Sequence, residues 1–221
     1  MENIKENLKK IKAELDKGVL LLAVTKTRTP EEINTAIDEG VTDIGENKVQ
    51  EITDKYDRVK PVRWHMIGHL QTNKVKYIID KVHMIHSVDS MKIAKEIDKR
   101  AAAKGLTMDI LIQVNPASEK SKFGISTGET ENLIKEILEC CKNIRIRGLM
   151  CVVPFAEDPE EIRGYFAQVK EQYDRYGKIS HERLDFKYLS MGMTHDYKVA
   201  VEEGSNLVRI GTAIFGERVY N

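Results

Sequence analysis

The chain of 221 residues carries 35 lysine plus arginine and 35 aspartate plus glutamate side chains, for a formal net charge of zero. No overall basic field is therefore available to attract nucleic acid or anionic lipid. No apolar run approaches the ~20 residues that span a membrane, so the sequence predicts a cytoplasmic protein that binds neither nucleic acid nor membrane.

The chain begins with an amphipathic stretch. Ile4, Leu8, Ile11 and Leu15 recur at helical spacing among charged residues. The segment lacks the apolar core and the cleavage site of a signal peptide. We therefore expect a helix over residues 2–16, ahead of the first strand.

Eight short apolar or β-branched runs then alternate with stretches of helical spacing. The predicted strands lie near residues 19–25, 42–45, 63–67, 83–87, 108–114, 144–151, 186–190 and 207–211. Helical spacing between them is carried by Ile33/Ile37, Val49/Ile52/Tyr56, Val75/Ile78/Ile79, Ile93/Ile97/Ala101, Leu133/Ile137 and Ile162/Phe166/Val169/Tyr173. Four glycines end a helical stretch just before a strand, where a left-handed cap is needed: Gly18, Gly40, Gly105 and Gly204.

This order of elements predicts an α/β fold of the single (β/α)8 TIM-barrel type, because an open doubly wound sheet usually has about five or six strands. No linker or low-complexity tract divides the chain, so residues 1–221 are expected to form one barrel domain. In such barrels the active site lies at the carboxyl ends of the strands. Phosphate commonly binds at the loops after strands seven and eight.

Lys26 stands at the carboxyl end of the first predicted strand and precedes the turn-forming residues 27–30. Partial burial there would lower the pKa of the amine and free its lone pair for attack on a carbonyl, as a Schiff-base lysine requires. The alternative is a strand-end lysine that extends into water.

Strands seven and eight are predicted to end in polar, glycine-containing segments. Residues 190–194 read SMGMT, and residues 208–216 read VRIGTAIFG. Backbone N–H groups and hydroxyls at two adjacent helix starts would form an anion cradle beside Lys26, with Arg209 pointing inward. Each segment could instead be an ordinary turn, and Arg209 a salt-bridged arginine. Together these groups suit pyridoxal phosphate: the lysine for C4′, the cradle for the phosphate and the guanidinium for the ring nitrogen.

Histidines and cysteines give no support for a metal site or a disulfide framework. His65 and His69 are four residues apart but lie across a strand-to-turn stretch, where that spacing does not place them on one helical face. Cys140, Cys141 and Cys151 form no CxxC pair and are odd in number, so we expect them to be reduced.

On these residues the chain resembles the pyridoxal-phosphate homeostasis protein family, also called the proline synthase co-transcribed bacterial homologue family. The matching segments run in order from residue 23 to residue 216. They read AVTKT (23–27), GENKVQE (45–51), WHMIGHLQTNK (64–74), SKFGI (121–125), RGLM (147–150), LSMGM (189–193) and VRIGTAIFG (208–216).

The resemblance implies an alanine-racemase-like barrel that lacks the C-terminal β domain and holds pyridoxal 5′-phosphate as an internal aldimine on Lys26. The other implied cofactor contacts are Ser190, Gly211 and Thr212 for the phosphate, Arg209 for the ring nitrogen, and Asn47, Met150 and Met191 as wall residues. It also implies a role in intracellular vitamin B6 homeostasis, buffering or delivering the cofactor. Apo pyridoxal-phosphate-dependent enzymes would be the recipients, and a monomer is the expected state.

Two further segments border the predicted site. Residues 115–128 form a long loop after strand five that we expect to act as a mobile cover. Gln71 and Asn73 either cap the helix that follows them or contact a ligand or partner at the rim.

Arg209 also argues against catalysis. A guanidinium only donates hydrogen bonds, so a ring nitrogen facing it stays unprotonated and the cofactor is a weak electron sink. A racemase needs a second acid/base, which alanine-racemase-like enzymes take from a C-terminal β domain that a chain ending at Asn221 is not expected to contain. Tyr197 and Tyr220 are the remaining candidates for that base. The rival interpretations are a small pyridoxal-phosphate-dependent racemase and an aldolase-type barrel that forms a Schiff base with its substrate.

Overall fold

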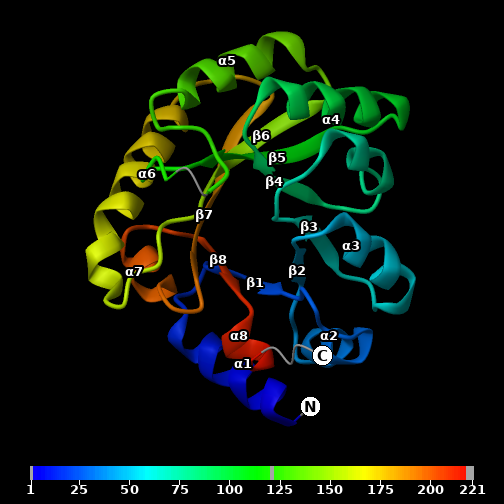
Figure 1. The fold of residues 1–221 in the computed structure, drawn as a ribbon, viewed down its shortest axis with the longest axis vertical. Helices are drawn as coiled ribbons and strands as arrows, with labels where there is room; N and C mark the ends of the chain where they lie inside the picture. Colours follow the sequence, from blue (N-terminus) through cyan, green and yellow to red (C-terminus); the bar gives the residue numbers. More distant parts are fainter. Residues whose placement is uncertain (1, 120–121, 218–221) are drawn as a thin grey trace.

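Eight parallel strands close into one barrel in the computed structural model, which describes residues 2–119 and 122–217 (Figure 1). Each strand pairs with the next in the chain, and β1 pairs with β8. The strands are β1 (Leu20–Val24), β2 (Asp43–Glu46), β3 (Arg63–Met66), β4 (Met84–Val88), β5 (Met108–Val114), β6 (Ile144–Cys151), β7 (Leu184–Met193) and β8 (Leu207–Ile210). The predicted barrel is confirmed.

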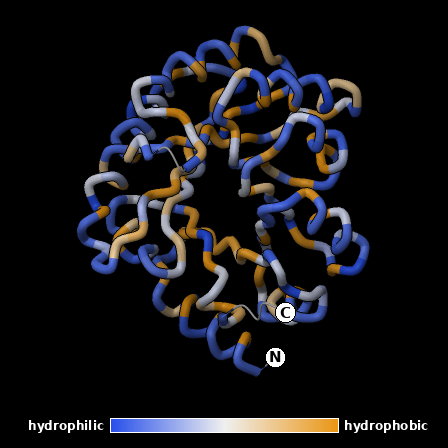
Figure 2. Tube along the Cα trace, viewed as in Figure 1, coloured by the Kyte–Doolittle hydropathy of each residue, from blue (hydrophilic) through white to orange (hydrophobic). Residues whose placement is uncertain are grey.

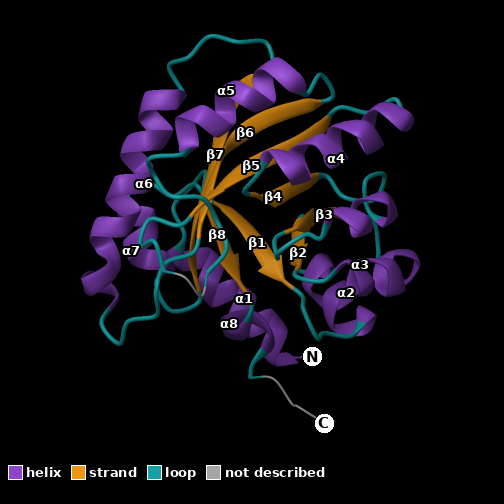
Figure 3. Cartoon of the chain, turned by 45° about the horizontal axis from the view of Figure 1, so that its top comes forward, coloured by secondary structure: helices purple, strands orange, loops and turns teal. Residues whose placement is uncertain are grey.

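Helices surround the barrel on its outer side (Figure 3). They are α1 (Glu2–Glu14), α2 (Pro30–Asp38), α3 (Val49–Lys55), α4 (Met91–Ala103), α5 (Thr130–Cys140), α6 (Arg163–Tyr176), α7 (Tyr197–Glu202) and α8 (Thr212–Phe215), with the short 3₁₀ segments η1 (Tyr56–Arg58), η2 (Thr72–Tyr77) and η3 (Pro159–Ile162). The helical spacing at Val75 and Ile78 thus belongs largely to a 3₁₀ turn, which also brings residues three apart to one side.

The backbone has the predicted left-handed glycines but a longer strand β7 than predicted. Gly18, Gly40, Gly105 and Gly204 have φ values of 105°, 83°, 65° and 92°, so all four occupy the predicted left-handed position. The segment 190–194, in contrast, is not simply a turn after strand seven. β7 continues to Met193 because Ser190 and Met193 pair with Leu207 and Arg209 of β8.

The hydrophobic core fills the layer between the strands and the helices. Figure 2 shows apolar residues concentrated along the strands and on the inner sides of the helices. Ile44, Ile110 and Ile210 point from the barrel into this layer and are completely buried, as is Phe166 of α6. A smaller apolar cluster of Met84, Leu111 and Met150 is separate from this layer. Burial of each large apolar side chain contributes about 1.5–3 kcal/mol, so the layer dominates the stability of the fold.

A chain of hydrogen bonds links three buried residues of β2, β3 and β4. Asp43 Oδ1 lies 2.9 Å from His65 Nε2, and His65 Nδ1 lies 2.9 Å from His86 Nε2. Arg63 Nε donates to Asp43 Oδ1 at 2.7 Å. Although burial opposes ionisation, hydrogen bonds from His65 and Arg63 hold the pKa of Asp43 well below its usual range.

The protonation states in this chain follow from burial. Desolvation lowers the pKa of His65 and lowers that of His86 well below the usual value, so both imidazoles are neutral. The Asp43 carboxylate can only accept, so His65 donates from Nε2 and accepts at Nδ1 from His86. His86 Nδ1 is then a buried acceptor without a hydrogen-bond partner among the described residues.

None of the helices within residues 2–119 and 122–217 is both long and apolar enough to cross a membrane. Across the same part of the chain, no three histidine, cysteine, aspartate or glutamate side chains group closely enough to hold a metal ion. His65 and His69 are used separately: His65 is buried against Asp43, whereas the His69 ring stacks on Phe123 with centroids 3.9 Å apart.

We predict that the free energy of unfolding falls as the pH is lowered from about 6.5 toward 4. In this range the unfolded chain protonates His65 and His86 more readily than the folded state, where burial lowers both pKa values, and each such proton costs up to about 1.4 kcal/mol of stability per pH unit. The depressed pKa of Asp43 extends the loss to lower pH. Urea titrations at several pH values measure this slope.

The double variant His65→Leu/His86→Leu tests the assignment. It should show a shallower slope between pH 6.5 and 5, even if its stability at pH 8 is lower. A control at the exposed His181 should leave the slope unchanged. An unchanged slope in the double variant would show that these imidazoles are not the acid-sensitive groups.

Candidate functional site

A pocket opens at the carboxyl ends of β1, β7 and β8. Its walls are formed by Val24, Lys26, Arg28, Met193, Thr194, His195, Arg209, Gly211 and Thr212. Three of these nine residues are lysine or arginine, and none carries a carboxylate. Such a lining favours an anionic ligand. Four of the predicted site residues, Lys26, Arg209, Gly211 and Thr212, line this one pocket.

Lys26 reaches the pocket because β1 ends two residues before it. The β1–β8 register pairs Leu22 with Arg209 and Ala23 with Ile210, so the segments that follow β1 and β8 leave the barrel side by side. Lys26 is half-buried at this point. It is one of the residues that line the pocket.

Arg209 is held rigidly inside the barrel. Its Nη1 donates to Ser190 O at 2.8 Å and to Ser190 Oγ at 2.7 Å, and its Nη2 donates to Cys151 O at 2.8 Å. The residue is 4% exposed, and burial lowers the pKa of its guanidinium. The sequence-based alternative of a salt-bridged arginine does not describe these contacts, because its hydrogen-bond partners here are a hydroxyl and two carbonyls.

Ser190 therefore acts first on Arg209. It is completely buried, and its hydroxyl oxygen accepts from the guanidinium, so the hydroxyl hydrogen points elsewhere. Gly211 and Thr212 lie directly on the pocket, at the start of α8. A Cβ on Gly211 would lie 3.2 Å from Val24 O, so the backbone segments at Gly211 and Val24 approach each other closely here.

The three predicted wall residues occupy different places. Asn47 follows β2 directly and is half-buried, and Gly68 approaches its backbone closely. Met150 is buried in the small apolar cluster and pairs in register with Ser190. Met191 lies in the main hydrophobic layer, and its backbone groups bond to Ser205 Oγ. None of the three is among the residues that line the pocket.

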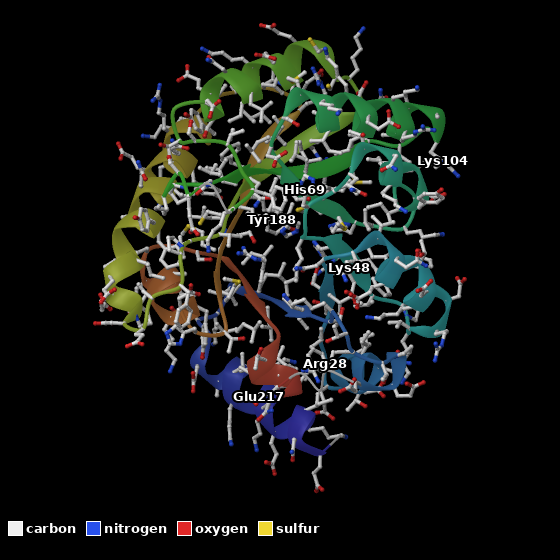
Figure 4. The ribbon with its side chains drawn as sticks, viewed as in Figure 1. Arg28, Lys48, His69, Lys104, Tyr188 and Glu217 are labelled. Atoms are coloured by element: carbon white, nitrogen blue, oxygen red, sulfur yellow. The ribbon has the colours of Figure 1, made fainter. Side chains whose placement is uncertain are left out.

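The sequence-based reasoning did not single out Arg28, Met193 or His195 as pocket residues. Arg28 donates through Nη2 to the carbonyls of Gly216 and Glu217, which ties the β1–α2 turn to the end of α8 (Figure 4). A positive charge two residues after Lys26, in a turn, was the available signal. Met193 and His195 belong to the segment after Ser190, where 39% exposure of Met193 leaves an apolar edge at the pocket.

The candidates for a second acid/base are placed away from this pocket or outside the description. Tyr197 donates its hydroxyl to Glu14 of α1 at 2.5 Å, and burial with this contact raises its pKa to about 12. It therefore joins α7 to α1. Tyr220 lies outside the described residues.

The rim segments make specific contacts. In the described part of the 115–128 loop, Asn115 Nδ2 donates to the carbonyls of Glu119 and Lys122, and Lys122 Nζ donates to Val153 O at 3.0 Å. Movement of this loop as a cover stays a prediction. Gln71 stands at the start of η2 without a side-chain cap hydrogen bond, so the capping interpretation of Gln71 is wrong.

The chain is similar in sequence to a known protein family and to curated proteins. Residues 1–219 match the family described as "Alanine racemase, N-terminal domain". A pyridoxal phosphate homeostasis protein of Aquifex aeolicus is 44% identical over 202 residues, which covers 90% of this chain and 87% of that protein.

Solved structures agree as well. PipY of Synechococcus elongatus, solved with PLP bound, has a TM-score of 0.87 and 30% identity, covering 96% of this chain and 100% of that chain. Alanine racemase of Clostridium difficile has a TM-score of 0.76 at 16% identity, and the match covers 61% of the racemase chain. The racemase likeness shows the fold alone.

Proposed function

The chain belongs to the pyridoxal phosphate homeostasis protein family, and on this premise we propose that it binds pyridoxal 5′-phosphate through Lys26 and buffers or delivers it. The observation that carries the proposal is the shared pocket of Lys26, Arg209, Gly211 and Thr212. A related structure, PipY, was solved with PLP bound, which supports the same ligand here.

The residues present fit the chemistry of this cofactor. A lysine amine can form a Schiff base with an aldehyde, and the cofactor's aldehyde, phosphate and ring nitrogen need an amine and hydrogen-bond donors. Arg209 supplies donors for the ring nitrogen. The N–H groups at the start of α8 and the Thr212 hydroxyl supply donors for the phosphate. Ser190 is not among the residues that line the pocket, and the hydroxyl hydrogen that it does not use toward Arg209 is a further donor. Asn47, Met150 and Met191 remain weaker candidates as neighbours of the ring.

The proton donors and acceptors near the pocket fit a protein that holds the cofactor better than an enzyme. The guanidinium of Arg209 offers the ring nitrogen a donor that does not give up its proton, which keeps the cofactor a weak electron sink. Tyr197 is engaged with Glu14, so it does not serve as the second base of a racemase. The curated relatives carry the name of a homeostasis protein rather than that of an enzyme.

The setting of this role is part of the proposal. Cys140, Cys141 and Cys151 are free thiols, and burial raises the pKa of Cys141 to about 11 and that of Cys151 to about 12. Free thiols, two of them buried, suit the cytoplasm. We propose a monomer that passes the cofactor to apo enzymes, which sedimentation and transfer assays with an apo enzyme would test.

We predict that the protein purified with pyridoxal 5′-phosphate is yellow and that borohydride fixes the cofactor on Lys26. Lys26→Ala should abolish the visible band and keep the fold, because the hydrophobic layer does not depend on this amine. Absorbance spectra and peptide mass spectrometry measure both. The exposed Lys48 provides a control, since Lys48→Ala should retain the band. Recovery of the label on Lys48, Lys74 or Lys122 would refute the assignment.

We predict that the phosphate contributes at least ~100-fold to affinity. Unphosphorylated pyridoxal would leave about three donors at Ser190, Gly211 and Thr212 without their charged acceptor, each hydrogen bond being worth ~1.5–3 kcal/mol. Water offsets part of this loss, and a deficit above ~3 kcal/mol remains. Absorbance titrations with both compounds measure the ratio. Equal affinities would mean that the ends of β7 and β8 do not hold the phosphate.

We predict that the cofactor-loaded protein neither racemises alanine nor decarboxylates common amino acids at about 1 s⁻¹ or faster. The reason is the donor-only contact of Arg209 together with the engagement of Tyr197. Chiral chromatography of a panel of amino acids provides the measurement. Sustained multiple turnover on any of them would support the racemase interpretation instead.

A further inference from the structure

A buried cluster of three charged residues lies behind the turn that carries Lys26. Glu46 ends β2, and Glu51 and Lys55 belong to α3. The Glu46 side chain is completely buried, and the side chains of Lys55 and Glu51 are 11% and 20% exposed. Burial raises the pKa of Glu46 to about 7, against the lowering effect of Lys55. None of these three residues lines the pocket, so ligand binding as proposed does not account for them.

Lys55 uses all three of its N–H donors in this cluster. Its Nζ donates to Glu46 Oε1 at 2.9 Å, to Glu51 Oε2 at 2.8 Å and to the backbone carbonyl of Thr25 at 3.0 Å. Glu46 Oε1 also accepts from Thr25 Oγ1 at 2.8 Å. The residue that precedes Lys26 is therefore fixed through both its carbonyl and its side chain.

Glu51 fixes the residue that follows Lys26. Its Oε2 accepts from the backbone N–H of Thr27 at 2.6 Å. Thr27 has φ of 65°, a left-handed conformation that is unfavourable for a β-branched residue. The hydrogen bond to Glu51 offsets that cost and holds the turn in place.

We propose that Glu46, Glu51 and Lys55 are positioning residues that orient Lys26 toward the pocket for bond formation with an aldehyde. Thr25 and Thr27 are held toward α3 on one side of the backbone, and Lys26 between them faces the pocket on the other. Orientation of this kind matters when the amine bonds to the aldehyde carbon and the aldehyde oxygen leaves as water. The proposal rests on the proposed Schiff base.

The competing explanation is that the cluster only stabilises the fold. A pair of ligands separates the two explanations: pyridoxal 5′-phosphate, and 4-deoxypyridoxine 5′-phosphate, which keeps the ring and phosphate but has no aldehyde. A variant that misorients Lys26 lowers the affinity for the first ligand alone. A variant that loosens the whole pocket lowers the affinity for both ligands.

The primary variant is Glu51→Ala, because Lys55→Met would leave Glu46 as an uncompensated buried carboxylate. We expect Glu51→Ala to lower the affinity for pyridoxal 5′-phosphate by about tenfold or more and to slow the appearance of the visible band. Affinity for 4-deoxypyridoxine 5′-phosphate, measured by calorimetry, should change less than twofold. Glu51→Gln, which keeps an acceptor for the Thr27 N–H, should restore most of the lost affinity.

Glu131→Ala is the matched control, because Glu131 also pairs with a lysine four residues on, Lys135, at 2.8 Å on the surface of α5. Glu131→Ala should change the affinity for neither ligand. If Glu51→Ala does not fold, Glu51→Asp, whose reach is one methylene shorter, should show the same selective loss at smaller amplitude.

Equal weakening of both ligands, or no weakening of either, would overturn the positioning role. Failure of the proposed function has a different signature: wild type itself would bind both ligands equally, and Lys26→Ala would leave the spectrum unchanged.

Discussion

The parallel pairing of β1 with β8 is the constraint on which the candidate site depends. Leu22 lies opposite Arg209, so the chain leaving β1 toward Lys26 runs beside the chain leaving β8 toward Gly211. The two segments come from opposite ends of the sequence. Because each strand is bonded on both sides in a closed barrel, neither segment can shift without breaking a ladder. Sheet register, rather than any mutual attraction, brings two cations to one pocket.

That arrangement brings like charges together, and the turn after β1 separates them from two nearby carboxylates. Lys26, Arg28 and Arg209 all line the pocket, so their positive charges repel one another, and Glu32 Oε1 compensates Arg28 from 3.5 Å away. The carboxylates of Glu46 and Glu51 lie on the other side of the turn, where they contact Lys55 and the residues flanking Lys26. The negative charge thus shapes the turn and leaves the pocket open to an anionic ligand.

The alternation of apolar and helical patterns was sufficient to predict all eight strands and the barrel, because both periods follow from burial against one layer. Lys26 and Arg209 were predictable as unusual charges at strand ends. The residues after Ser190 looked like a turn because the segment contains Gly192 and Thr194, whereas pairing of Met193 with Arg209 keeps residues 191–193 in β7. The positive charge of Arg28 in the turn after Lys26 did not by itself indicate a pocket residue, since its position involves hydrogen bonds to the carbonyls of Gly216 and Glu217, about 190 residues away in the sequence.

The surroundings of Arg209 bear on why such a barrel would hold a cofactor rather than use it. Ser190 and Cys151 accept its hydrogen bonds, and burial raises the pKa of the Cys151 thiol to about 12, so this thiol is a poor proton source at neutral pH. His86, whose pKa is lowered by burial, by His65 and by the charge of Arg209, is neutral and presents an acceptor. Within the described residues, the groups that contact or electrostatically affect Arg209 thus include no ready acid for a ring nitrogen. A pyridine nitrogen facing Arg209, as proposed, would keep its lone pair, because the guanidinium would donate a hydrogen bond without giving up the proton that catalysis on an amino acid needs.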